Sequence, residues 1–211
     1  MLVLAIDTST STVVTGLVED GKSVGESILE NCRDHNEQLV AATQRALSAA
    51  AKQFSDVDAV VVGAGPGPFT GLRVGMATGL AFADALGIPV YGVCSLDAIG
   101  VQLPGKALVC TDARRKEVYW ARYEDGARVA GPEVSAYADI STAGFDAVNM
   151  PESVRTHLAG THDLYPTPVA LVGLVDFSVA PEPLIPLYLR RPDAKEPASK
   201  PKSPAIPDVQ L

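Results

Sequence analysis

The stretch GAGPGPFTGLR, residues 63–73, joins a short β-branched run that ends at Gly63 to a helical pattern that extends from Leu72 to Leu86. Its glycines suggest a loop that holds phosphate. A Walker loop ends in Gly-Lys-Ser/Thr and a dinucleotide loop reads G-x-G-x-x-G, and the stretch has neither spacing. Its prolines also remove two backbone N–H donors. We therefore predict a rigid connection between a buried strand and a close-packed helix.

Composition limits the classes of protein to consider. The chain has 211 residues, 47% of them hydrophobic, which is enough for one sizeable core or two small lobes. The formal net charge of -8 works against a broad grip on nucleic-acid phosphates, so we expect another chain to hold any RNA.

Two further features bear on location and redox state. The apolar start breaks at Asp7, too early for a signal peptide, and no apolar run is long enough for a membrane helix, so we expect a cytoplasmic protein with no membrane contact. Cys32, Cys94 and Cys110 are widely spaced and odd in number. We interpret them as buried thiols that form neither a disulfide framework nor a metal cluster.

Residues 1–100 predict one α/β lobe. Three strands and the turn signal Asp20-Gly21 indicate an antiparallel meander. A capping box, Asp34 with Glu37, predicts the start of a helix, and Ser95 is expected to cap a short helix. The strand, helix, strand order after the meander implies parallel pairing through a crossover. The expected strands cover 2–6, 12–18, 22–29, 58–63 and 89–93, and the expected helices cover 36–51 and 72–86.

Residues 101–190 predict a smaller second lobe with a less regular pattern. Two strands, 107–111 and 117–123, are expected on either side of a polar turn. A helix over 152–158 and a strand over 169–172 are the remaining predictions in this half. Residues 191–211 carry five prolines without an apolar period, so we predict that this tail is disordered.

A stripe of glycines marks the second helix. Gly71, Gly75 and Gly79 recur every four residues, and each glycine in a helix costs about 1 kcal/mol relative to alanine. Close approach of another backbone would compensate this cost. The approaching element is either this chain's own helix or sheet or a helix of a second protein, and the sequence does not separate the two. If the partner is a second protein, replacing Gly75 with Leu should block docking without unfolding the chain.

Four separated motifs resemble those of the bacterial TsaB (YeaZ) family. They are AIDTST at 5–10, GPGPFTGLRVG at 65–75, DARRKEVY at 112–119 and PLYLR at 186–190. The resemblance spans most of residues 1–190. It implies the actin-like ATPase fold (ASKHA, ribonuclease H-like), with two lobes of mixed sheets flanked by helices.

The resemblance also implies a function. Members of this family act as a non-catalytic partner of TsaD, the enzyme that transfers threonylcarbamoyl to N6 of adenosine 37 in tRNAs reading ANN codons, while TsaE supplies an ATPase. The implied assembly pairs the two predicted helices with those of TsaD, or with a second copy as a homodimer, and touches tRNA only indirectly. The expected contact residues are Leu39, Thr43, Leu47, Gly71, Leu72, Gly75, Met76, Gly79 and Leu80.

Catalytic features of the related enzyme are missing. Its His-Met-Glu-Gly-His metal motif corresponds to Ser95-Leu96-Asp97-Ala98-Ile99 here, and Ser and Ile do not replace histidine on a transition metal. His35, His157 and His162 lack ligand spacing, so we predict no metal site and no cofactor. Asp7, Thr8 and Ser9 are either a remnant of a cofactor-binding hairpin or, as we favour, a turn that satisfies its own backbone.

The sequence leaves two questions open. The resemblance marks Asp112, Arg114, Arg115 and Glu117, which form either an interlobe polar network or a contact for a third subunit. The alternative function is a weak actin-like ATPase or kinase that uses Asp7 as its metal-side carboxylate. A protease is disfavoured because HExxH is absent and the sequence identifies no general base beside a Ser or Cys nucleophile.

Overall fold

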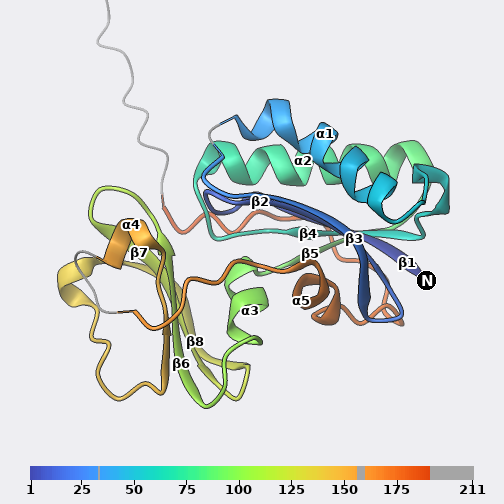
Figure 1. The fold of residues 1–211 in the computed structure, drawn as a ribbon. Helices are drawn as coiled ribbons and strands as arrows, with labels where there is room; N and C mark the ends of the chain where they lie inside the picture. Colours follow the sequence, from blue (N-terminus) through green and yellow to red (C-terminus); the bar gives the residue numbers. More distant parts are fainter. Residues whose placement is uncertain (33, 156–159, 191–211) are drawn as a thin grey trace, which may run out of the picture.

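The chain folds around two β-sheets, each covered by helices or loops (Figure 1). The structure, a computed structural model, describes residues 1–32, 34–155 and 160–190. Within the described residues, no helix is both long and apolar enough to cross a membrane.

The first sheet has five strands in the order β3-β2-β1-β4-β5. The predicted meander is confirmed, because β1 pairs antiparallel with β2 and β2 with β3, and the predicted parallel pairing holds for β1 with β4 and β4 with β5. This order and mixture of directions is the ribonuclease H-like arrangement of an actin-like lobe. The strands are β1 (Leu2–Asp7), β2 (Val13–Glu19), β3 (Lys22–Leu29), β4 (Ala59–Gly63) and β5 (Val90–Val93).

Helices cover both faces of this sheet, which explains why β1 and β4 are buried throughout. Leu4 and Ile6 point to the face covered by α1 (His35–Ala49) and α2 (Phe69–Leu86). Val3 and Ala5 point to the opposite face, where α5 (Pro168–Gly173) packs.

The ends of two helices differ from the predictions. α1 begins at His35, but no side chain caps it; the carbonyl of Asp34 accepts bonds from Glu37 and Gln38 N–H instead. The residue before α3 (Ser95–Gly100) is Cys94, so Ser95 does not cap that helix, and its hydroxyl has a different partner described below. α2 ends as expected at Gly87, which adopts the left-handed conformation with φ 66°.

The second sheet has four strands in the order β8-β7-β6-β9. Two of these strands, β6 and β7, were expected from the sequence. The other two were not, because Gly131 and Pro132 interrupt the strand pattern of β8 and because β9 is only three residues long. Its elements are β6 (Lys106–Asp112), β7 (Glu117–Glu124), β8 (Ala127–Ala136), β9 (Ala147–Asn149) and α4 (Glu152–Arg155). Two short 3-10 helices, Phe54–Asp56 and Tyr137–Asp139, complete the structure.

The C-terminal part differs from the sequence-based expectations at residues 169–172. Residues 169–172 are helical rather than extended, because Pro168 occupies the first turn and the Thr167 hydroxyl accepts a bond from the N–H of Ala170. Residues 156–158 of the expected helix over 152–158 lie outside the described residues, as does the tail 191–211.

The end of the described chain returns to the first lobe. Leu171 is fully buried against the first sheet, and Leu184 packs on the core under α1 and α2. The N–H of Leu187 donates to the carbonyl of Ala64 at 2.8 Å. The expected boundary, which placed all of 101–190 in the second lobe, therefore differs from the structure at residues 168–187.

Replacing Leu171 with Ala tests this return of the chain. The side chain is 0% exposed, so its truncation should lower the free energy of unfolding by about 2–5 kcal/mol. Val169 lies on the same helix at 39% exposure, and Val169→Ala should change the free energy by about 0.5 kcal/mol or less. Urea denaturation measures both values, and equal small losses would contradict the packing of α5 on the sheet.

Candidate functional site

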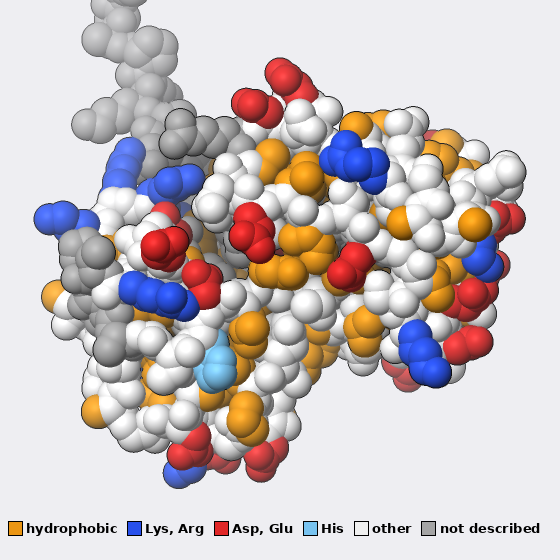
Figure 2. Space-filling model, in the orientation of Figure 1, with side chains coloured by type: hydrophobic (Ala, Val, Ile, Leu, Met, Phe, Trp, Pro, Cys, Tyr) orange, Lys and Arg blue, Asp and Glu red, His pale blue; other side chains and the backbone are white. Residues whose placement is uncertain are grey.

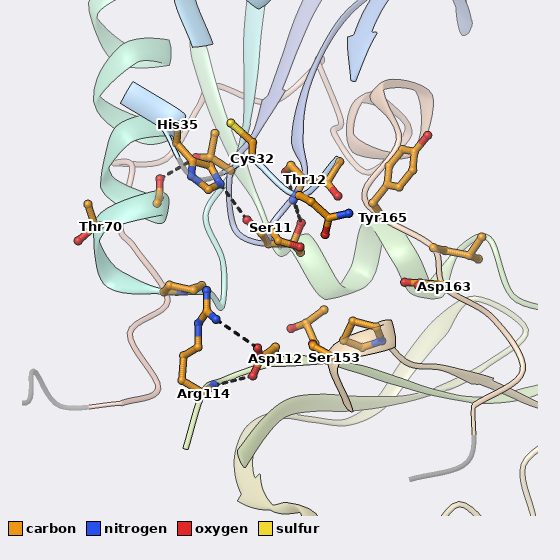
Figure 3. Close-up of a pocket in the computed structure, with 18 of the residues that line it drawn as sticks. Ser11, Thr12, Cys32, His35, Thr70, Asp112, Arg114, Ser153, Asp163 and Tyr165 are labelled. Atoms are coloured by element: carbon orange, nitrogen blue, oxygen red, sulfur yellow. Dashed lines mark hydrogen bonds and ion pairs between the residues drawn. The ribbon is translucent and has the colours of Figure 1, made fainter. Parts of the chain in front are cut away.

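A cleft of about 770 Å³ separates the two lobes. The first lobe contributes the turn after β1, the segment before α1 and the first turn of α2, while the second lobe contributes the end of β6 and the segment around α4 (Figure 3). Many of the residues that line it carry hydroxyl or amide side chains, including Thr8, Thr10, Ser11, Asn31, Thr111 and Asn149.

Asp7, the candidate metal-side carboxylate, lies beneath this cleft and is 1% exposed. One carboxylate oxygen accepts from the N–H of Ser9 at 2.8 Å and from its hydroxyl at 2.7 Å. The other oxygen accepts from the hydroxyl of Ser95 at 2.5 Å. Sequence reasoning did not find Ser95 as a partner of Asp7, because the two residues are 88 positions apart and no short motif joins them.

Burial raises the pKa of Asp7 above its ordinary value of 3.8, and the hydrogen bonds from Ser95 and Ser9 oppose this shift. Thr8 is also occupied, because its hydroxyl donates to the carbonyl of Gly71 at 2.7 Å. The polar groups of this turn are therefore bonded partly within the turn, through Ser9, and partly to Ser95 and Gly71 outside it.

The glycines of 63–79 make room for this turn and for the strand behind it. At Gly63, a Cβ would collide with the Asp7 carboxylate, and at Gly75 it would collide with the Thr8 hydroxyl. A Cβ at Gly67 would collide with the backbone of Ser9, one at Gly71 would approach the Thr8 carbonyl, and one at Gly79 would collide with Val62. The stripe thus approaches this chain's own turn and sheet. Leu at position 75 should therefore disturb the fold itself, contrary to the sequence-based expectation.

Most of the expected partner-contact residues lie inside the first lobe. Leu80 is 50% exposed and Gly71 is partly exposed, so both remain available at the surface. The others are buried because they form the inner faces of α1 and α2, and they cannot touch a partner without rearrangement. The buried residues are Leu39, Thr43, Leu47, Leu72, Gly75, Met76 and Gly79.

The polar residues at 112–117 divide between two surroundings. Asp112 lines the cleft, where its carboxylate accepts from the N–H of Arg114 at 2.7 Å and lies 3.8 Å from the Arg114 guanidinium (Figure 3). Glu117 pairs instead with Arg190 at 3.1 Å, and Arg190 also donates to the carbonyl of Ala113. Arg115 is exposed on the same turn.

The four motifs meet at the loop 64–69. Its Gly67 lies against Ser9 of the first motif and accepts a bond, at 3.4 Å, from the hydroxyl of Tyr119 in the third. Its Phe69 stacks on Tyr188 of the fourth motif with ring centroids 5.1 Å apart. The glycine-rich loop is therefore the joint at which the two lobes and the C-terminal segment contact one another.

Metal ligands are not assembled around this joint. Among the described residues, no three His, Cys, Asp or Glu side chains are grouped closely enough to hold an ion. His35 bonds the carbonyl of Thr10, His162 lies on a β-bridge to Asn149, and His157 lies outside the described residues. The three cysteines are free: Cys110 is buried, as expected, with a pKa raised to about 12, while Cys32 and Cys94 are only partly buried.

Comparison with known proteins defines the class first. Residues 29–187 match the family model described as TsaD: tRNA N6-adenosine threonylcarbamoyltransferase. An uncharacterized protein of Mycobacterium tuberculosis is 53% identical over 197 residues, which cover 92% of this chain and 93% of that protein. The chain is thus a member of the family that this model describes.

Two named relatives define the branch. The tRNA threonylcarbamoyladenosine biosynthesis protein TsaB of Escherichia coli is 33% identical over 130 residues, covering 59% of this chain and 55% of the relative. The solved structure of YeaZ from Pseudomonas aeruginosa superposes with a TM-score of 0.73 at 25% identity, covering 89% of this chain and 99% of YeaZ. The chain belongs to the TsaB (YeaZ) family.

Replacing Asp7 with Asn tests the burial of the carboxylate. The raised pKa means that the folded protein binds more protons than the unfolded chain between pH 3.8 and the raised value. The free energy of unfolding should therefore fall as pH rises through this window and level off above it. Asp7→Asn should remove this component and be at least as stable as the wild type at pH 7, because its amide can donate to Ser95.

Denaturant unfolding across the acid range measures this difference. The exposed Asp84→Asn is the control and should leave the pH profile unchanged. A variant at Asp7 that loses stability at pH 7 while keeping the acid-side slope would contradict the assignment.

Proposed function

We propose that this chain is a non-catalytic subunit that pairs with a TsaD-like enzyme and supports threonylcarbamoyl transfer to N6 of adenosine 37 in tRNAs reading ANN codons. The observation that carries the proposal is the state of Asp7. A metal-side carboxylate must present free oxygens to the cleft, whereas those of Asp7 are buried and bonded to Ser9 and Ser95. The names of the TsaB relatives support the pathway.

The outer face of α1 and α2 is the surface we propose for pairing. The two helices lie side by side on one face of the first sheet, and their outer sides face away from it (Figure 1). Val40 on α1 is 44% exposed and Leu80 on α2 is 50% exposed. Small residues surround Leu80, since Ala77 and Ala81 are exposed beside it, and they allow a partner helix to approach closely.

The same surface also bears on how this chain assembles when the TsaD-like subunit is absent. A helix pair can associate with its own copy about a two-fold axis, so we propose a homodimer when the TsaD-like subunit is absent. A TsaE-like ATPase would join the heterodimer rather than this chain alone. A cytoplasmic location follows from a tRNA substrate.

Omission from a reconstituted reaction tests the role. The mixture contains the TsaD-like enzyme, the adenylate-forming enzyme, a TsaE-like ATPase, ATP and tRNA, and threonylcarbamoyl incorporation is measured with and without this chain. We expect incorporation to require the chain. With Asp7→Asn, incorporation should remain within about twofold of the wild-type value, a change of about 0.4 kcal/mol in the activation free energy. Independence from the chain would contradict the proposal.

The pairing surface has its own variant in the same mixture. Leu80→Glu places a charge in the proposed interface, where charged groups are depleted, and should abolish co-elution with the TsaD-like enzyme and incorporation together. Val129 on β8 is 57% exposed and lies in the other lobe, so Val129→Glu is the matched control and should leave both unchanged. Normal pairing by Leu80→Glu would show that α2 is not the interface.

A further inference from the structure

Two aromatic rings stand exposed at the junction of the lobes. Phe69 begins α2 and is 45% exposed, and Tyr188 is 43% exposed in the C-terminal segment. Their centroids lie 5.1 Å apart, and neither ring belongs to a buried hydrophobic cluster of the described residues. Each ring therefore lies outside the core and keeps part of its surface exposed beside the contact between the two.

A guanidinium adjoins this pair. Arg73 lies one helical turn after Phe69, and its guanidinium carbon is 5.2 Å from the centroid of the Phe69 ring. The Arg73 side chain is exposed. Aromatic rings beside arginine are the combination with which proteins bind single-stranded nucleic acid, because bases stack on the rings and phosphates pair with the cation.

The turn between β6 and β7 presents a second basic group. Arg114, Arg115 and Lys116 are consecutive, exposed and all left-handed, with φ values of 64°, 54° and 63°. Residues other than glycine rarely adopt this conformation, so three such residues in succession require support from their surroundings. The Asp112 carboxylate accepts from the Arg114 N–H at 2.7 Å, the Tyr137 N–H donates to the Lys116 carbonyl at 2.9 Å, and Arg190 donates to the adjoining Ala113 carbonyl at 2.9 Å.

The C-terminal segment links the basic turn to the rings. Arg190, which donates to the turn at the Ala113 carbonyl, is two residues from Tyr188, and Arg114 lines the same cleft as Thr70, the residue after Phe69. Figure 3 shows Arg114 extending from the second lobe toward the end of α2 that carries Thr70. Figure 2 shows Lys and Arg side chains, interspersed with Asp and Glu side chains, near the point where the described chain ends.

We propose that this surface binds a single-stranded segment of RNA directly, with bases on Phe69 and Tyr188 and phosphates on Arg73 and the 114–116 turn. The inference rests on the proposed function for the identity of the RNA as the substrate tRNA. It replaces the expectation that this chain touches tRNA only indirectly. An acidic peptide would satisfy the basic groups but leaves the paired rings without a role, so the rings favour RNA.

The opposing charges determine how strong this binding is. Asp112 and Glu117 flank the turn and are engaged by Arg114 and Arg190. The whole chain carries a net charge of -8. We therefore expect the isolated chain to bind RNA weakly and with a strong dependence on salt, and to act together with a partner that holds the rest of the molecule.

Fluorescence anisotropy of a labelled, unmodified tRNA transcript with an ANN-reading anticodon tests the proposal on the isolated chain. The titration runs from about 50 to 200 mM salt. Phe69→Leu keeps apolar volume but removes the ring, and should weaken binding about tenfold. Arg73→Ala and Lys116→Ala should each reduce the slope of log affinity against log salt by about 1.

Lys22→Ala and Lys106→Ala are the controls. Both lysines are exposed, and Lys106 begins β6 at the strand end opposite the basic turn. These variants should leave the affinity within about twofold of the wild type, since surface changes away from a contact have effects near zero.

Three results would overturn the proposal: absence of binding at low salt, equal losses in the control variants, and patch variants that weaken co-elution with the TsaD-like subunit but leave RNA affinity unchanged. The last result would assign the surface to a protein partner. Because RNA affinity is measured without the enzyme, its failure is distinguishable from failure of the proposed function, which the omission reaction tests separately.

Discussion

The buried carboxylate of Asp7 is the contact on which the rest of the first lobe depends. It lies over the bare Cα of Gly63 and takes hydrogen bonds from Ser9 and Ser95, so it fixes the end of β1, the end of β4 and the start of α3 in one place. A buried carboxylate is costly unless it is bonded, which ties each of these segments to the others. In this chain the side chain at position 7 joins these segments through hydrogen bonds, where an actin-like ATPase would use a carboxylate on a metal ion.

The joint at 64–69 extends this constraint to the second lobe. Gly67 bonds Tyr119, Ala64 bonds Leu187 and Phe69 stacks on Tyr188. These contacts reach both the β6–β7 hairpin and the C-terminal segment, so a stretch that suggested a phosphate loop acts as the junction of the molecule. The surface left at its edge carries the exposed rings and the basic turn, while the outer face of α1 and α2 remains open for a partner.

The first lobe was largely predictable from the sequence, because its strands are apolar runs and its helices have clear periods and stop signals. The contact between Asp7 and Ser95 was not, since it joins residues 88 positions apart through side chains alone. The glycine stripe indicates close packing without identifying its partner, because a spacing of four does not show which element packs there; the partners are Thr8 and Val62. The sequence predicts a strand over 169–172 because Leu171 and Val172 suit both structures, whereas Pro168 in the first turn and the Thr167 cap favour the helix.

Titration calorimetry with ATP and Mg²⁺ tests the central claim, that the Asp7 turn is a closed structural element, most directly. The cleft offers no free carboxylate from Asp7, and the first hairpin uses the Ser9 N–H internally. The account predicts no heat of binding up to about 1 mM nucleotide, the weak end of the usual range of affinities. Stoichiometric binding at micromolar concentration that is lost in Asp7→Asn would contradict it and favour the actin-like ATPase alternative.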